Sequence, residues 1–170
     1  EVKLNQSNPP LVSVVIPCYN HENFVQDSIQ SVINQTYQNI ELIIIDDGSK
    51  DGSVEKIQEM IPACQERFIR FEFRHRPNKG LSATLNEALE WCEGEFFSPL
   101  ASDDRYLRNK VLSQVEKISE FDEMIALSSN ISYIDETDNF IRNTNNPERI
   151  YFFEDIFLAK YFLPAASILI

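Results

Sequence analysis

The chain alternates short apolar runs with stretches whose apolar residues recur at helical spacing, and this alternation constrains its fold more than any other feature. "LVSVVIP" (11–17) and "IELIIID" (40–46) are rich in β-branched residues and apolar at most positions, as expected for strands buried on both faces. Between these runs, apolar residues at i, i+4, i+7 and i+8 predict a helix over about 23–35: Val25, Ile29, Val32 and Ile33.

The same alternation continues through the next segments. "FIRFEFR" (68–74) has the period-2 pattern of a strand near a sheet edge, with Ile69, Phe71 and Phe73 on one face, and "EFFSPLA" (95–101) reads as a fourth strand. A second helix is expected to stop at Pro62 and a third to close at Gly94. The apolar stripes of these helices and of a fourth are Val54, Ile57 and Ile61; Leu81, Leu85, Ala88, Leu89 and Cys92; and Val111, Val115 and Ile118.

The last third of the chain departs from this regular pattern. "MIALSSNISYI" (124–134) predicts a fifth strand, and "FIRNT" (140–144) a partner that forms a hairpin with it. A short amphipathic segment is expected over 154–162, and "PAASILI" (164–170) resembles the start of another strand. We therefore predict one α/β domain over 11–170, a mostly parallel, Rossmann-like sheet with helices on both faces, preceded by a polar tail over 1–10.

Composition limits the partners that such a domain can have. A formal net charge of -12 disfavours nucleic-acid phosphates and anionic lipid, so a polyanionic ligand needs a cation, a few basic side chains or backbone N–H groups. The three cysteines have no C-x-x-C spacing, which favours a reduced, cytoplasmic protein over a disulfide or zinc scaffold. We expect neither a signal peptide at the start nor a transmembrane segment, because no apolar run reaches that length.

Polar residues follow each predicted strand, and the carboxyl ends of parallel strands share one edge where ligands collect. They are "PCYN" (17–20), "DDGS" (46–49), "RHRPNKG" (74–80) and "ASDD" (101–104). Each has a structural explanation: a strand exit, a solvated turn with Asp51 or Ser53 capping a helix, a basic turn, and an N-cap at Ser102 or Asp103. A calcium loop over 47–58 is disfavoured because Gln58 stands at the bidentate-glutamate position. Four coincident structural explanations are a weaker interpretation than one site.

Four segments together resemble family 2 glycosyltransferases, which use nucleotide-diphosphate sugars and have the GT-A fold. "VSVVIPCYN", "QTYQNIELIIIDDGSKDGS", "NKGLSATLNEAL" and "GEFFSPLASDD" occur in the order and approximate spacing of that family. The resemblance is close over about 11–120. It implies a donor that is a nucleotide-diphosphate sugar, a UDP-sugar being expected, a glycan or lipid-linked hydroxyl acceptor, and a divalent cation, Mn²⁺ or Mg²⁺.

The resemblance also implies roles for particular residues. Pro17 and Tyr19 would pack on the nucleotide base, Asp47 would accept a hydrogen bond from uracil, and Asn78 and Lys79 would approach the base and diphosphate. At the last strand exit, the resemblance implies ribose and metal contacts for two adjacent carboxylates, Asp103 and Asp104. Asp46 is expected instead to support the turn by accepting backbone N–H groups.

The chain also departs from the family pattern. Ala101 stands where the first aspartate of the family's acidic string belongs, and Leu85 and Ala88 replace an arginine and a glycine. The general base is expected beyond Ile170, so the chain is expected to be truncated on its C-terminal side.

The leading hypothesis is an inverting transferase, with bacterial surface polysaccharide synthesis expected by analogy, in the cytoplasm or on the inner face of the membrane. A degenerate, non-catalytic nucleotide-sugar-binding module is the alternative. An α/β phosphotransferase is disfavoured, because the first strand ends in "PCYN" with no carboxylate to phosphorylate.

Overall fold

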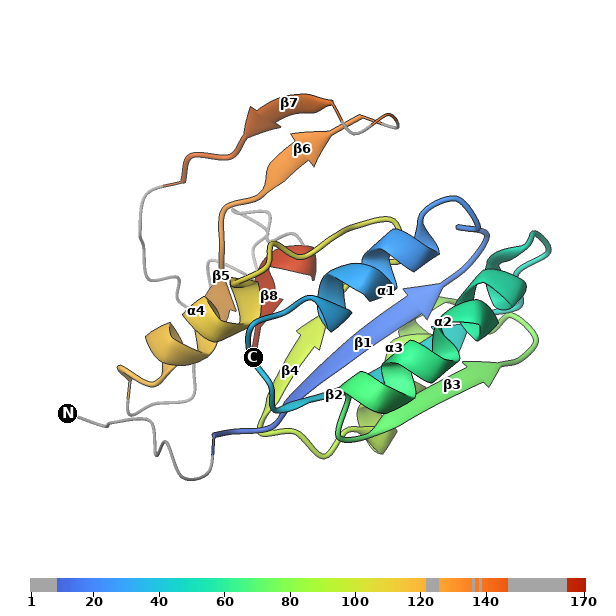
Figure 1. The fold of residues 1–170 in the computed structure, drawn as a ribbon, viewed down its shortest axis with the longest axis horizontal. Helices are drawn as coiled ribbons and strands as arrows, with labels where there is room; N and C mark the ends of the chain where they lie inside the picture. The colour runs from blue at the N-terminus through green and yellow to red at the C-terminus, as the bar shows by residue number, and fades with distance from the viewer. Residues whose placement is uncertain (1–8, 122–125, 136, 138, 147–164) are drawn as a thin grey trace.

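A four-stranded parallel sheet forms the centre of the protein (Figure 1). The computed structural model describes residues 9–121, 126–135, 137, 139–146 and 165–170. In spatial order the strands are β3 (Phe71–His75), β2 (Ile40–Asp46), β1 (Val12–Cys18) and β4 (Phe96–Pro99). All three neighbouring pairs of strands are parallel. In the central β1–β2 pair, the register runs from Val12 opposite Ile40 to Cys18 opposite Asp46. The predicted α/β sheet is confirmed, with β3 at its edge.

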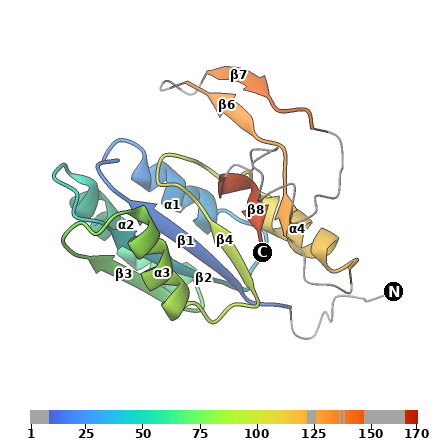
Figure 2. The ribbon, with the colours of Figure 1, turned by 180° about the vertical axis from the view of Figure 1, so that it is seen from behind.

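Helices cover both faces of this sheet, because β1 and β2 are apolar in both directions. Val14 and Leu42 belong to one core cluster with residues of α1 (Val25–Ile33), α2 (Ser53–Arg67) and α4 (Lys110–Ile118). Val15 and Ile43, one residue along each strand, belong to a second cluster with Ala88 of α3 (Leu81–Trp91). Figure 2 shows α3 on the face opposite to α1 and α2. The alternation of side chains along a strand therefore builds two cores.

A buried carboxylate ties the amino-terminal ends of the strands together. Glu41 is 0% exposed, and its Oε1 accepts hydrogen bonds from Ser13 Oγ (2.5 Å) and from the backbone N–H groups of Glu93 (2.6 Å) and Gly94 (3.0 Å). Its Oε2 lies 2.5 Å from Arg70 Nη1. A charged group in "IELIIID" is thus fully paired, as burial of a charge requires.

The prediction that α2 stops at Pro62 is wrong, since the helix continues to Arg67. Pro62 removes the N–H that would bond to the carbonyl of Gln58, but both residues are exposed, so water can satisfy that carbonyl. The end of the helix is held by Arg67, whose guanidinium donates to the carbonyls of Ile33 and Tyr37, among others. These contacts outweigh one lost backbone hydrogen bond.

The predicted stripes of α3 and β3 are partly wrong. Leu81 and Leu89 are 61% and 55% exposed, and the buried positions of α3 are Thr84 and Ala88. The reason is that α3 packs its small side chains close against the sheet. Ile69, predicted to face the core from β3, precedes that strand and is exposed. Most residues of the stripes predicted for α1 and α4 are buried: Val25, Ile29, Val32, Val111, Val115 and Ile118.

The predicted fifth strand is two short strands in two different sheets. β5 (Leu127–Ser128) pairs antiparallel with β8 (Ile168–Leu169), which follows the 3-10 helix η1 (Ala165–Ser167). β6 (Ser132–Ile134) forms the predicted hairpin with β7 (Phe140–Asn143). Between β5 and β6, the Asn130 side chain accepts hydrogen bonds from Thr144 Oγ1 and Asn146 N–H, which interrupts the run. The amphipathic segment over 154–162 lies outside the described residues.

None of the helices in the described part of the chain is long and apolar enough to cross a membrane.

Candidate functional site

The strand order places two sequence-distant strand exits side by side. The chain runs outward from β1 through β2 to β3 and then returns to place β4 on the other side of β1. This reversal is the point where ligands bind in open α/β sheets, in the crevice beyond the carboxyl ends of the strands. The exits of β1 and β4 are therefore expected to share a site with the exit of β2.

A pocket of about 350 Å³ lies at this edge. Its lining comes from the exits of β1, β2 and β4 and from the start of α3: Pro17, Cys18, Tyr19, His21, Asp47, Asn78, Gly80, Leu81, Thr84, Ala101 and Ser102. Four of the predicted donor-binding residues are thus brought together, namely Pro17, Tyr19, Asp47 and Asn78. Lys79, Asp103 and Asp104 are exposed and are not in that lining.

Asp46 supports the turn after β2, as predicted. It is 0% exposed, and its Oδ1 accepts the backbone N–H groups of Gly48 (3.1 Å) and Ser49 (2.9 Å). The Ser49 hydroxyl donates to Oδ2 at 2.5 Å, and His75 Nδ1 lies 2.9 Å from Oδ1. These hydrogen bonds hold the loop after β2 in place. Asp46 is not among the residues that line the pocket.

Asp47 joins the β2 exit to the loop before α3. Its Oδ1 accepts the backbone N–H of Lys79 (2.8 Å) and a hydrogen bond from Arg76 Nη1, and its Oδ2 accepts the backbone N–H of Gly80 (2.9 Å). Burial alone would raise the pKa of Asp47, but these hydrogen bonds outweigh it and hold the pKa below its usual value. Asp47 is therefore a carboxylate of fixed orientation that lines the pocket.

The basic loop "RHRPNKG" has less charge to offer than its sequence indicates. Arg76 contacts Glu87 (2.7 Å) and Asp47, Arg74 contacts Glu87 (3.3 Å) and Glu72, and His75 contacts Asp46. The hydrogen bond from Arg76 is the main reason that the pKa of Glu87 is lowered. Most of this positive charge is thus paired within the protein, and what Lys79 gives to Asp47 is its backbone N–H.

A left-handed backbone residue sets the exit of β1. Asn20 has φ +56°, its N–H donates to Ser49 Oγ (2.8 Å), and its Oδ1 accepts the N–H of Lys50 (2.8 Å). Asparagine tolerates this conformation better than most residues do. The turn leaves Tyr19 45% exposed and in the pocket lining, where its ring is available for stacking.

The loop after β4 carries two carboxylates that could hold a divalent cation. Asp103 and Asp104 are adjacent and exposed, and no helix begins there, so the alternative explanation of Ser102 or Asp103 as an N-cap is excluded. Although Asp104 is partly open to solvent, loss of solvation raises the pKa of its carboxyl, and the like charge of Asp103 raises it further. A cation would offset this repulsion.

The described residues hold no group of three or more His, Cys, Asp or Glu placed for a metal. Two carboxylates with ligand oxygens are, however, a common magnesium environment.

His21 is a pocket residue that the sequence interpretation missed. Its Nδ1 lies 2.7 Å from Ser102 Oγ and 3.9 Å from Asp103 Oδ1, so it joins the exits of β1 and β4. Its backbone N–H donates to Ser53 Oγ (2.9 Å). The signal was its position directly after "YN" at a strand exit. Leu81 and Thr84 of α3 were also missed, because they lie in the pocket through the packing of α3 and not through a strand exit.

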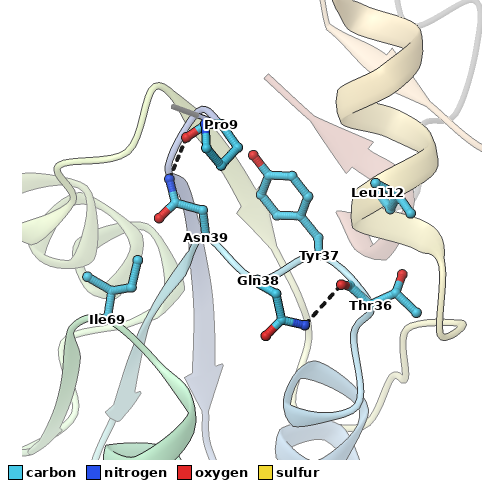
Figure 3. Close-up of a pocket in the computed structure, with 7 residues that line it drawn as sticks. All are labelled: Pro9, Thr36, Tyr37, Gln38, Asn39, Ile69 and Leu112. Carbon is cyan, nitrogen blue, oxygen red and sulfur yellow. Dashed lines mark hydrogen bonds between the residues drawn. The ribbon is translucent and has the colours of Figure 1, made fainter. Parts of the chain in front are cut away.

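A larger hollow of about 470 Å³ lies at the opposite end of the sheet (Figure 3). There the Asn39 amide donates to the Pro9 carbonyl (2.6 Å) and the Gln38 amide to the Thr36 carbonyl (3.0 Å). Its described lining contains no carboxylate, imidazole or cationic side chain. The smaller pocket, which lies at the exits of β1, β2 and β4, is the candidate functional site.

Comparisons with known proteins agree with this geometry. Residues 13–167 match the family model described as glycosyl transferase family 2. An uncharacterised glycosyltransferase of Haemophilus influenzae is 34% identical over 143 residues, covering 84% of this chain and 56% of its own length. One of Rickettsia felis is 37% identical over 114 residues, 66% of this chain and 18% of its own. GlyG of Streptococcus pneumoniae is 31% identical, covering 76% and 42%. The chain thus spans only part of these relatives.

Two solved structures share the fold. The crystal structure of Staphylococcus aureus TarS 1-349 in complex with UDP has a TM-score of 0.57 at 24% identity, covering 65% of this chain and 32% of that one. The mannosyltransferase PcManGT of Pyrobaculum calidifontis, in complex with GDP-Man and Mn²⁺, has a TM-score of 0.64 at 20% identity, covering 75% and 37%. At these identities the likeness concerns the fold alone.

Proposed function

Because the chain belongs to glycosyl transferase family 2, we propose that it is the donor-binding part of an enzyme that transfers a sugar from a UDP-sugar to a hydroxyl acceptor. The arrangement of Tyr19, Asp47 and Asn78 around one pocket supports this proposal. It is also supported by structures of similar fold that hold UDP, UDP-GlcNAc or GDP-Man. Tyr19 and Pro17 would pack on the base, with Lys79 and Asp103 at the diphosphate and ribose.

The observation that carries the choice of uracil is the hydrogen-bonding capacity left on Asp47. A carboxylate oxygen accepts about two hydrogen bonds. Oδ1 is filled by Lys79 and Arg76, whereas Oδ2 accepts only the Gly80 N–H among the described residues. One acceptor position therefore remains. Uracil presents a single N–H between two carbonyls, whereas guanine presents adjacent donors that need both oxygens of a carboxylate.

Asn78 complements such a base. Its amide oxygen accepts the Gly80 N–H (3.2 Å), which leaves its NH₂ group to donate to a uracil carbonyl. A donor beside one acceptor position satisfies a carbonyl and the N–H of uracil. Guanine presents a carbonyl and an N–H in the same way, but its adjacent amino group would find no second acceptor position on Asp47. Asp47 and Asn78 together therefore favour UDP over GDP.

Asp103 and Asp104 would hold the divalent cation, Mn²⁺ or Mg²⁺, which neutralises charge on the departing diphosphate when bound. Inverting transfer to a glycan or lipid-linked acceptor needs a general base, which we expect beyond Ile170. We propose a role in surface polysaccharide synthesis, in the cytoplasm or on the inner face of the membrane.

Calorimetric titration of UDP and of GDP into the protein with Mg²⁺ tests the donor. We expect UDP to bind at least about 10-fold more tightly, a difference of about 1.4 kcal/mol. Asp47→Asn should reduce this preference. Asp51→Asn is the matched control, because Asp51 also accepts loop hydrogen bonds but lies outside the pocket lining. Equal or tighter binding of GDP by the unmodified protein would exclude the proposed base recognition.

A second candidate is a nucleotide-sugar-binding module without turnover, which Ala101 in place of a carboxylate favours. Ala101 lines the pocket. Incubation of the full-length protein with UDP-sugars separates the two candidates: release of UDP supports an enzyme, and tight binding without release supports the module.

A further inference from the structure

His21 lines a pocket in which no lysine or arginine is found among the described lining residues. We propose that His21 donates a hydrogen bond from Nε2 to the diphosphate of the donor, and so is a substrate-contacting residue of this site. The inference rests on the proposed function, because it requires a nucleoside diphosphate in the pocket. It assigns to the β1 exit a contact with phosphate in addition to stacking on the base.

The position of His21 matches the path that a nucleoside diphosphate would follow. Asp47 lies at the proposed base end of the pocket, and Asp103, a proposed metal ligand, lies outside the lining at the β4 exit. His21 lines the pocket, and its Nδ1 lies 3.9 Å from Asp103 Oδ1. A diphosphate that reaches from the base to a cation held by Asp103 must therefore pass beside this imidazole.

Ser102 sets which ring nitrogen carries the proton. Ser102 is 1% exposed, and its hydroxyl lies 2.7 Å from His21 Nδ1, with the Cys18 thiol as another neighbour. A buried hydroxyl proton needs an acceptor, and an imidazole nitrogen is a stronger acceptor than a thiol sulfur, so we assign Ser102 as the donor to Nδ1. In neutral histidine this leaves the proton on Nε2, which is then a donor and has no partner among the described residues.

The orientation of the ring is also restrained from other directions. The backbone N–H of His21 donates to Ser53 Oγ, and the imidazole ring lies edge-on to the Phe24 ring with centroids 6.3 Å apart. A donor that is held before the ligand arrives loses little entropy on binding. His21 is therefore preorganised for an anion.

The charge of the site creates a need for such a donor. Asp103 and Asp104 repel a diphosphate, and Arg74 and Arg76 are paired with carboxylates of the protein. A cation between the two aspartates would neutralise only part of the phosphate charge. A preorganised N–H beside it contributes attraction in addition to that of Lys79, which is also proposed to approach the diphosphate.

Affinities for uridine and for UDP, measured with Mg²⁺ by calorimetry or NMR titration, test the inference. His21→Ala should weaken UDP binding at least about 10-fold and leave uridine binding within about 2-fold, because only UDP has the diphosphate. His21→Lys should restore most of the loss, since lysine also donates to phosphate. His75→Ala is the control: the chain's other histidine contacts Asp46, so the ratio of the two affinities should not change.

The outcomes separate this inference from the proposed function. Equal losses for uridine and UDP in His21→Ala would mean that His21 only shapes the loop, which overturns the inference and leaves the function standing. An unchanged UDP affinity overturns it as well. An unmodified, folded protein that binds no UDP contradicts the proposed function and this inference with it. If His21→Ala does not fold, Ser102→Ala should show a smaller loss of the same selectivity for UDP.

Discussion

Replacement of Asp46 by alanine tests whether this buried carboxylate holds the loop that carries Asp47. The substitution removes the acceptor for the backbone N–H groups of Gly48 and Ser49 and for the Ser49 hydroxyl. A buried donor without a partner costs about 1–3 kcal/mol. Because Gly48 and Ser49 are half-buried, water recovers part of that cost, and we expect a loss of about 3 kcal/mol in the free energy of unfolding.

Urea unfolding followed by the fluorescence of Trp91, the single tryptophan, measures this loss. With a denaturant slope of about 2 kcal/mol per molar, the midpoint should fall by roughly 1.5 M. Asp103→Ala is the control, because it removes the same group from an exposed position and should change stability by less than about 0.5 kcal/mol. If both variants unfold at the same urea concentration, Asp46 does not hold the loop.

Two further predictions concern the support of the site. Burial lowers the pKa of Lys110 from 10.5 to about 7. Between pH 7 and 10.5 the unfolded chain therefore binds more protons than the folded protein. The free energy of unfolding should rise with pH over that window, by up to about 1.4 kcal/mol per pH unit. The stability difference between the unmodified protein and Lys110→Met, followed by urea unfolding across that window, should show this slope, and a flat difference would refute it. Gly48 has φ +79°, and a Cβ there would lie 2.7 Å from Asn78 N, whereas Gly80 at φ +87° has open space. Thermal unfolding should therefore show a larger loss for Gly48→Ala than for Gly80→Ala, with weaker UDP binding in Gly48→Ala; equal losses would exclude the clash.

The sheet could be predicted from the sequence because its strands carry their own signal. "LVSVVIP" and "IELIIID" are apolar on both faces, and this pattern requires cover by helices on each side. The end of α2 could not be predicted in the same way. It depends on Arg67 reaching carbonyls about thirty residues away, as at Ile33 and Tyr37, and such contacts leave no local pattern.

The site was partly predictable for the same reason. Residues that follow strands, such as Tyr19 and Asp47, reach the edge of the sheet through topology alone. The pairing of Arg76 was not predictable, because it depends on Glu87 facing the loop from the next helix. The position of His21 in the pocket was not predictable either, because it depends on contact with Ser102 at the β4 exit, 81 residues further along the chain.

Titration of UDP with and without Mn²⁺, into the unmodified protein and into Asp104→Asn, tests the central claim most directly. Asp104 makes no hydrogen bond through its side chain within the described residues, so the variant should fold normally. We expect Mn²⁺ to tighten UDP binding at least about 10-fold in the unmodified protein and to have little effect in the variant. An affinity for UDP that does not depend on Mn²⁺ in either protein, or the absence of UDP binding, would contradict a metal-assisted donor site at this edge of the sheet.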